Sequence, residues 1–189
     1  MPRKPDVALE GRIVDAAYRI WSQQGEGSVT MRAVARAART TTPTLYQRFR
    51  NKQDLKHFLE ERARQKLFDS VSGARSVLDI CGRTLKFTSE HRHEYRLLAT
   101  DWGIRYAQGL PMRSLEQLKR LLANELGGSP AEHRDLAFQL FAIVHGTAVL
   151  RPSDAEQGTT AEAMEQACLR ACEALLRDRA RSRKNSSKT

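Results

Sequence analysis

The sequence predicts an all-α protein of about nine helices, and three observations indicate this class. The composition is rich in alanine, leucine, arginine and glutamate, which favour helices. Apolar residues recur at three- and four-residue steps, which is the spacing of one face of a helix. The sequence contains no strand-like alternation and no hairpin turn signal. A chain of 189 residues is long enough for one large domain or two small ones.

Capping and helix-ending residues divide this pattern into separate elements. Glycine and proline mark many boundaries, because glycine ends helices well and proline fits only their first turn. The expected helices cover residues 7–24, 31–38, about two turns from Thr41 or Thr42, 51–71, 76–90, 94–106, 112–126, 130–151 and 160–179. The helix over residues 130–151 is apolar nearly all round, which predicts that it is buried on every side.

The third of these helices is the most informative one. Thr30 can cap the helix before it, and Pro43 lies in its own first turn, where a missing N–H costs little. The helix is too short to be stable alone, so its neighbours must hold it, with Leu45 and Phe49 in the core. A short, held helix that shows hydroxyls and a phenol to solvent suits the major groove of duplex DNA.

The start of the fourth helix predicts an anion site. Asn51 is a cap with Asp54 three residues later, a capping box with Asp in place of Glu. Lys52 therefore lies in the first turn, beside exposed N–H groups and the positive end of the helix dipole. Lys52, like Tyr46, has little structural reason to occupy its position, so we expect both to contact phosphate.

The positive charge is concentrated at the two ends of the chain. The net charge is +10, of which residues 1–60 carry +5, residues 61–176 carry zero and residues 177–189 carry +5. Basic residues near a helix-turn-helix indicate a phosphate partner. An alternative reading of the same charge is a nonspecific, charge-driven nucleic-acid-binding protein.

A wider set of positions resembles a known family. The residues that carry the likeness are Ile13, Asp15, Ala16, Ala17, Tyr18, Gly25, Thr30, Met31, Val34, Ala35, Ala38, Pro43, Thr44, Leu45, Tyr46, Phe49, Lys52, Asp54 and Leu55. This stretch, roughly residues 9–56, resembles the DNA-binding domain of TetR-type transcriptional regulators. The resemblance implies a three-helix helix-turn-helix domain over residues 1–56 and a C-terminal helical ligand-binding and dimerisation domain over 57–180, with a basic flexible tail over 181–189.

The resemblance also implies which residues meet a double-stranded DNA operator. The residues expected to read bases are Thr41, Thr42, Thr44 and Gln47. The residues expected to bind phosphate are Thr30, Tyr46 and Lys52, with Arg32, Arg39 and Arg48 as additional candidates. In the family the turn usually reads Ala-Gly-Val-Ser, and here residues 38–41 read Ala-Arg-Thr-Thr. Arg39 must therefore strain the turn or reshape it, because glycine tolerates a positive φ and other residues do not.

The remaining expectations concern the C-terminal part. By resemblance, the last two long helices form a homodimer, which binds a palindromic operator and acts as a repressor responsive to a small-molecule effector. The candidate pocket residues are Phe87, Tyr95, Trp102, Tyr106, Phe138, Phe141 and His145, although residues of these types are more often core than cavity wall. Cys168 and Cys172 share a helix face, which suits either inert buried thiols or a redox switch.

Several functions are not expected. The sequence has no catalytic set, no phosphate-cradling glycine loop and no metal-ligand spacing, so we expect neither an enzyme nor a bound cofactor or metal. No apolar run is long enough to span a membrane, and the first residues lack the apolar core of a secretory signal. Three cysteines without metal spacing suit a reducing compartment, so we expect a cytoplasmic protein.

Overall fold

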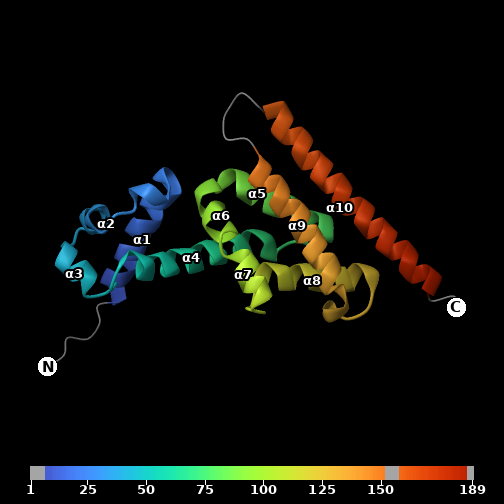
Figure 1. Cartoon of the computed structure of the whole chain (residues 1–189), viewed down its shortest axis with the longest axis horizontal. Coiled ribbons are helices and arrows are strands. Elements are labelled where there is room, and N and C mark those ends of the chain that lie inside the picture. Colours follow the sequence, from blue (N-terminus) through green and yellow to red (C-terminus); the bar gives the residue numbers. More distant parts are fainter. Residues whose placement is uncertain (1–6, 152–157, 187–189) are drawn as a thin grey trace. The chain divides into compact units, whose positions relative to one another are not determined.

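The computed structural model describes residues 7–151 and 158–186, and every regular element in these ranges is helical. The all-α prediction is confirmed. The elements are α1 (Val7–Gln24), η1 (Glu26–Ser28), α2 (Met31–Ala37), α3 (Thr42–Tyr46), α4 (Lys52–Ser72), α5 (Val77–Glu90), α6 (Arg92–Ala99), α7 (Trp102–Ala107), α8 (Arg113–Leu126), η2 (Pro130–His133), α9 (Arg134–Leu150) and α10 (Gly158–Ser186). Figure 1 shows them along the chain.

The chain divides into two compact units. The first comprises Met1–Lys66 and His91–Thr100, and the second comprises Leu67–Glu90 and Asp101–Thr189. In the first unit, α1 packs against α2 and α6, and α2 packs against α3. Figure 1 shows α1, α2 and α3 gathered at the start of α4. Helix α6 is thus a short excursion of the chain that belongs with the N-terminal helices.

The core of the first unit contains the residues that the apolar pattern selected. Leu45 of α3 and Phe49 are almost completely buried, as predicted, and so is Trp21 of α1. The other buried apolar side chains of the unit include Leu9, Ile13, Ala16, Ala17, Val29, Val34, Ala35, Ala38, Leu55, Leu59 and Ala63. Burial of Leu45 holds the five-residue helix α3 in place, which its length alone would not do.

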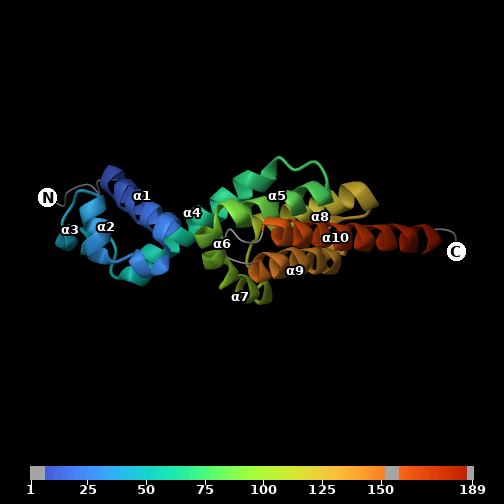
Figure 2. The same cartoon turned by 90° about the horizontal axis from the view of Figure 1, so that it is seen from above.

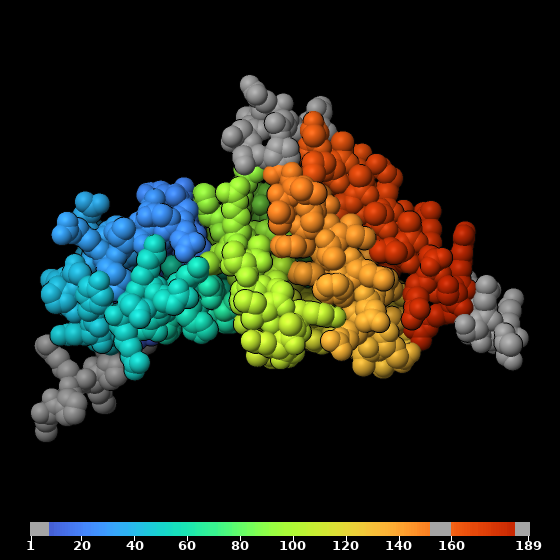
Figure 3. All heavy atoms as spheres, in the orientation of Figure 1, coloured from blue at the N-terminus to red at the C-terminus, as the bar shows by residue number. Residues whose placement is uncertain are grey.

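The second unit is a bundle built around α5, α8, α9 and α10. Helix α10 packs along both α5 and α9, and Figure 2 shows α9 and α10 side by side. Leu122 of α8, Leu140 of α9 and Cys172 of α10 are completely buried in this unit. In Figure 3, the atoms of α9 and α10 form adjoining areas of the same surface.

The structure differs from the predicted helices at two places. The helix expected over residues 94–106 is two helices, α6 and α7, which gives ten α-helices in the described ranges. At the break, the Thr100 hydroxyl donates to the Leu97 carbonyl at 2.8 Å. In a continuous helix, this carbonyl would accept from a backbone N–H. The last helix also runs to Ser186, where residues 160–179 were expected.

The prediction that α9 is buried on every side is wrong for the single chain. Phe138, Val149 and Leu150 are 41%, 61% and 74% exposed. An apolar surface on all sides of α9 therefore does not mean that this chain alone buries the helix. Part of its apolar surface is exposed among the described residues.

Candidate nucleic-acid interface

Two short helices and a tight turn position the predicted recognition residues. The Thr30 hydroxyl accepts from the Ala33 N–H at 3.1 Å and caps α2, and the Thr41 hydroxyl accepts from the Thr44 N–H at 3.3 Å and caps α3. Both caps are as the sequence predicts. Pro43 lies in the first turn of α3, where no intrahelical N–H is needed.

The turn between α2 and α3 keeps the shape that a glycine normally provides. Arg39 has a φ of +54° and is the non-glycine residue with a positive φ in the described chain. The Thr40 N–H donates to the Ala35 carbonyl at 2.9 Å, and the Arg39 N–H donates to the Arg36 carbonyl at 3.2 Å. These two bonds form a Schellman motif. Of the two outcomes expected for Arg39, strain or a reshaped turn, the structure has the strained residue.

The predicted base-reading residues lie together on and beside α3. Thr41 and Gln47 are exposed, and Thr42 and Thr44 are half-buried. The hydroxyls of Thr41 and Thr44 are 2.8 Å apart and hydrogen-bond to each other. A base that binds either hydroxyl must therefore share it with this bond or replace the bond.

The predicted phosphate-binding residues surround this surface. Tyr46 lies at the end of α3, and its side chain is half exposed. Arg32 and Arg39 are exposed, and Arg48 is half-buried. The four residues come from α2, the turn, α3 and the segment after it, so one short stretch of chain supplies them all.

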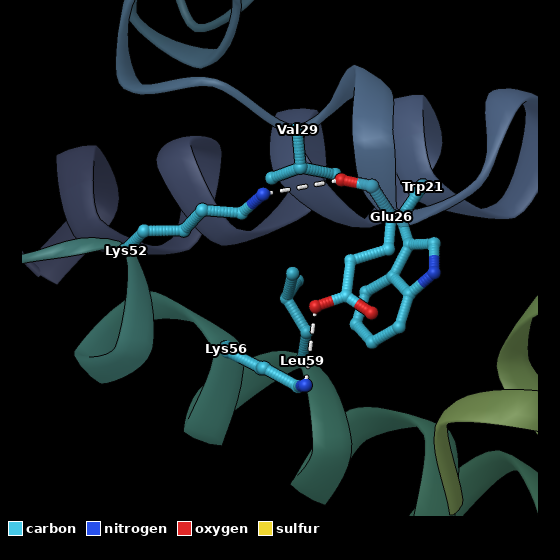
Figure 4. Close-up of a pocket in the computed structure, with 6 residues that line it drawn as sticks. All are labelled: Trp21, Glu26, Val29, Lys52, Lys56 and Leu59. Atoms are coloured by element: carbon cyan, nitrogen blue, oxygen red, sulfur yellow. Dashed lines mark hydrogen bonds and ion pairs between the residues drawn. The ribbon is translucent and has the colours of Figure 1, made fainter.

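Lys52 has a structural partner that the sequence did not reveal. Its ammonium group donates to the backbone carbonyl of Glu26, in η1, at 3.3 Å. One turn further along α4, the Lys56 ammonium group pairs with the Glu26 carboxylate at 3.1 Å. Figure 4 shows both lysines reaching to Glu26 across a hollow that Trp21, Val29 and Leu59 also line. The expectation that Lys52 has little structural reason to be there is therefore wrong.

The capping box at the start of α4 is present with one change. Asn51 Oδ1 accepts from the Asp54 N–H at 2.8 Å, as expected. For the return bond, the Asp54 carboxylate accepts from the Arg50 N–H at 3.1 Å, one residue before the cap. The helix start is therefore held on both sides, with Lys52 exposed in its first turn.

A buried polar cluster joins α1, α4 and α6 inside the first unit. Glu94 of α6 is 5% exposed, and its carboxylate accepts from the Tyr18 hydroxyl and the Lys66 ammonium group, each at 3.3 Å. Burial and the neighbouring Glu94 charge raise the pKa of Tyr18 well above its ordinary value. Sequence reasoning missed this cluster, whose members are up to 76 residues apart.

The predicted pocket residues fall into two groups. Trp102 and Tyr106 of α7 contact rings of α9 in the second unit: Trp102 lies 4.6 Å from Phe141, and Tyr106 lies 4.6 Å from Phe138, between ring centroids. The His145 ring stacks on Phe141 at 5.7 Å, and burial lowers the pKa of this histidine. Phe87 is buried on α5, whereas Tyr95 is buried on α6 and belongs to the first unit.

The three cysteines are free and buried. A hydrogen bond with Cys168 lowers the pKa of Cys172, but contact with Cys81 and burial outweigh it and raise the pKa to about 12. The hydrogen bond with Cys172 and burial likewise raise the pKa of Cys168. Protonated, buried thiols are poor nucleophiles, which favours the inert reading over the redox switch. Across residues 7–151 and 158–186, no group of three acidic, His or Cys side chains is arranged to hold a metal.

Helix length and hydropathy bear on a membrane role. Among the helices that the structure describes, none is both long and apolar enough to cross a bilayer.

The class that this geometry defines is an all-helical protein with an N-terminal helix-turn-helix. Residues 13–57 match the sequence model of a family described as bacterial regulatory proteins, tetR family. The predicted resemblance to TetR-family regulators is confirmed by this match. A comparison with curated proteins gives no significant match.

Solved structures with the same fold cover nearly the whole chain. A tetR-family transcriptional regulator from Streptomyces coelicolor has a TM-score of 0.68 at 19% identity, over 93% of this chain and 83% of that one. A TetR-like transcriptional regulator from Rhodococcus sp. RHA1 has a TM-score of 0.57 at 18% identity, over 92% and 96%. The multidrug binding protein EbrR, complexed with malachite green, has a TM-score of 0.53 at 21% identity, over 87% and 96%. The chain therefore has the fold of a TetR-type transcriptional regulator.

Proposed function

We propose that the chain is a sequence-specific, DNA-binding transcriptional regulator. It binds a palindromic operator as a homodimer and acts as a repressor whose operator binding responds to a small molecule. The observation that carries the proposal is the presentation of α3. A helix of five residues, held by the buried Leu45, shows hydroxyl, amide and phenol groups beside a set of basic side chains. This combination suits base reading in the major groove with phosphate contacts at its edges.

The contacts divide by chemistry. Thr41, Thr42, Thr44 and Gln47 carry short or amide side chains that suit base edges. Their hydroxyls and amides can both donate and accept, so they can match a base pattern. The groups that suit phosphate are Thr30, Arg32, Arg39, Tyr46, Arg48 and Lys52. Phosphate contacts fix the register of the domain on the duplex, and base contacts select the sequence.

The exposed face of α9 supports a homodimer through the last two helices. Val149 and Leu150 expose large apolar side chains, and Ala142 continues the same face. The solvent-exposed side of α10 carries small residues, including Ala163 and Ala167, which allow helices to approach closely. A second copy of the chain would remove this apolar surface from water. Two copies then present two recognition helices to two half-sites.

The ring contacts between α7 and α9 support an apolar, aromatic effector. Trp102, Phe141 and His145 form a continuous aromatic group in the second unit. The structural relative EbrR is described as a multidrug binding protein complexed with malachite green. An effector that prefers one arrangement of the dimer by about 1–3 kcal/mol changes operator affinity about 5- to 150-fold.

Selection of bound duplexes from a random DNA pool tests the function, with the full chain and a fixed salt concentration. We expect a recovered palindrome and an affinity for it about 10³- to 10⁷-fold above that for unrelated DNA. Sedimentation of the complex should give two chains per duplex. Equal affinity for all sequences, with a steep salt dependence, would instead support the charge-driven binder that the net charge of +10 also suits.

A further inference from the structure

Glu26 makes two different bonds to two lysines of one helix. Its backbone carbonyl accepts from the Lys52 ammonium group at 3.3 Å, and its side-chain carboxylate pairs with the Lys56 ammonium group at 3.1 Å. Figure 4 shows the two bonds on opposite sides of the same residue. The backbone and the side chain of Glu26 therefore act on different cations.

The two lysines are equivalent in position. They are four residues apart on α4, so they lie on one face and about 6 Å apart along the helix axis. Trp21, Val29 and Leu59 line the hollow beside them, and both ammonium groups reach across it to Glu26. Either ammonium group could meet a phosphate that approaches the start of α4.

The two bonds have opposite consequences for phosphate binding. A carbonyl is neutral, so Lys52 keeps its full charge and two of its three donors while its position is fixed. A carboxylate instead neutralises the charge of Lys56. It also competes with phosphate for the Lys56 ammonium group more strongly than a neutral acceptor does. Lys56 is also well covered, with a side chain that is 23% exposed against 55% for Glu26.

We propose that Lys56 is a further phosphate-binding residue and that the Glu26 carboxylate keeps it neutralised in the DNA-free protein. The inference rests on the proposed function, since it assumes that the start of α4 meets DNA. When the backbone of a duplex approaches, phosphate and the carboxylate compete for the same ammonium group. The half-exposed Glu26 side chain can leave for solvent, whereas the Glu26 carbonyl stays with the backbone of η1 and continues to hold Lys52.

Substitution of the carboxylate alone tests the proposal, because the carbonyl remains. Glu26→Gln should bind both operator and unrelated duplex about threefold more tightly at 50 mM salt. The slope of log affinity against log salt should steepen by up to about 0.9, the value for one more neutralised phosphate. Since a slope difference of 0.9 over a fourfold rise in salt corresponds to a factor of about 3.5, the threefold advantage should disappear by about 200 mM salt. Fluorescence anisotropy with labelled duplexes measures all three quantities.

Glu61→Gln is the matched control, because it makes the same charge change on the same unit. Glu61 pairs with Arg64 on α4 at 3.1 Å and lies nine residues beyond Lys52. In a Lys56→Gln background, Glu26→Gln should lose its advantage over Glu61→Gln. Thermal unfolding by circular dichroism verifies that each variant folds.

The outcomes separate the inference from the proposed function. A Glu26→Gln variant that at 50 mM salt binds like Glu61→Gln, or more weakly than the parent, overturns the role of Lys56, while operator selection by the parent leaves the regulator intact. An advantage that persists without Lys56 also overturns it. If the parent chain binds no duplex at all, the proposed function fails, and this inference fails with it.

Discussion

Replacing Arg39 by glycine should stabilise the protein while weakening its binding to DNA. Arg39 has a φ of +54°, and a left-handed conformation costs a residue with a β-carbon about 1–2 kcal/mol. Glycine removes that cost but adds about 0.5–1 kcal/mol of unfolded-chain entropy. The net gain in the free energy of unfolding is therefore about 0–1.5 kcal/mol, with a middle value of about 0.75 kcal/mol. The two Schellman hydrogen bonds use backbone atoms only, so the substitution retains them.

Urea unfolding measures this gain. Of the two tryptophans, Trp21 lies in the first unit and Trp102 in the second, so a Trp102→Phe background makes Trp21 fluorescence a reporter of the first unit. Arg39→Ala is the control, because it removes the same charge and keeps the β-carbon. It should leave stability within about 0.5 kcal/mol of the parent, as ordinary surface changes do. If Arg39→Gly is no more stable than Arg39→Ala, the turn is not strained and the argument fails.

The same pair of variants tests the phosphate contact proposed for Arg39. Both lose the guanidinium group, so both should bind every duplex more weakly and lower the salt slope by about 0.9. Stability and binding then move in opposite directions for glycine, and only binding moves for alanine. This separation explains why a residue that strains the turn is compatible with function. Unchanged DNA affinity in both variants would leave the arginine without the proposed contact.

Three further predictions follow from the described contacts. Lys52→Ala should weaken binding to all duplexes and lower the salt slope by about one, whereas Gln47→Ala should change the base preference in operator selection; identical behaviour would refute our division of the contacts. Folding raises the pKa of Cys172 from 9.0 to about 12 and also raises the pKa of Tyr18. The folded protein therefore holds these protons more tightly than the unfolded chain does. The contribution of the Cys172 thiol to stability is complete below pH 9 and is lost as the pH rises toward 12, and that of the Tyr18 phenol begins to be lost only above pH 10; a flat profile from pH 8 to 11 in urea unfolding would contradict this. Glu94→Gln should destabilise the first unit by about 1 kcal/mol. This is less than for a fully buried ion pair, because the Lys66 side chain is partly exposed to solvent. An unchanged free energy of unfolding would show that the Glu94 charge adds nothing to stability.

Local chemistry explains which features the sequence predicts correctly. The hydroxyls of Thr30 and Thr41 cap α2 and α3, and Asn51 caps α4, because a cap depends on residues three positions apart. Leu45 is buried on the inner side of α3, and Phe49, four residues later and just beyond the end of this helix, is buried as well. The sequence also locates the unusual turn at Arg39, but the choice between a strained and a reshaped turn depends on the backbone geometry that the structure shows.

Long-range contacts explain what the sequence does not predict. Glu26 and Lys56 are 30 residues apart, and Tyr18 and Glu94 are 76 residues apart, so no local pattern relates them. The length of α10 has the same cause. The Arg183 guanidinium donates to the Gly127 carbonyl at 2.9 Å, which favours helix beyond the residues that the apolar seam selects. Lys56 alone gave a local signal, because it repeats Lys52 one helical turn later.

Some of the polar groups proposed to meet DNA are already paired in the free protein, and this affects selectivity more than affinity. The Thr41 and Thr44 hydroxyls bond to each other at 2.8 Å, and Lys56 bonds to Glu26. Binding must replace these bonds. A correct base or phosphate therefore gains only the difference between the new hydrogen bond and the old one, each of which contributes about 0.5–1.5 kcal/mol. A wrong base leaves a broken pair without a replacement, which costs about 1–3 kcal/mol. Pairing within the free protein therefore weakens binding to mismatched DNA more than binding to the operator, and specificity can exceed what the number of base contacts alone suggests.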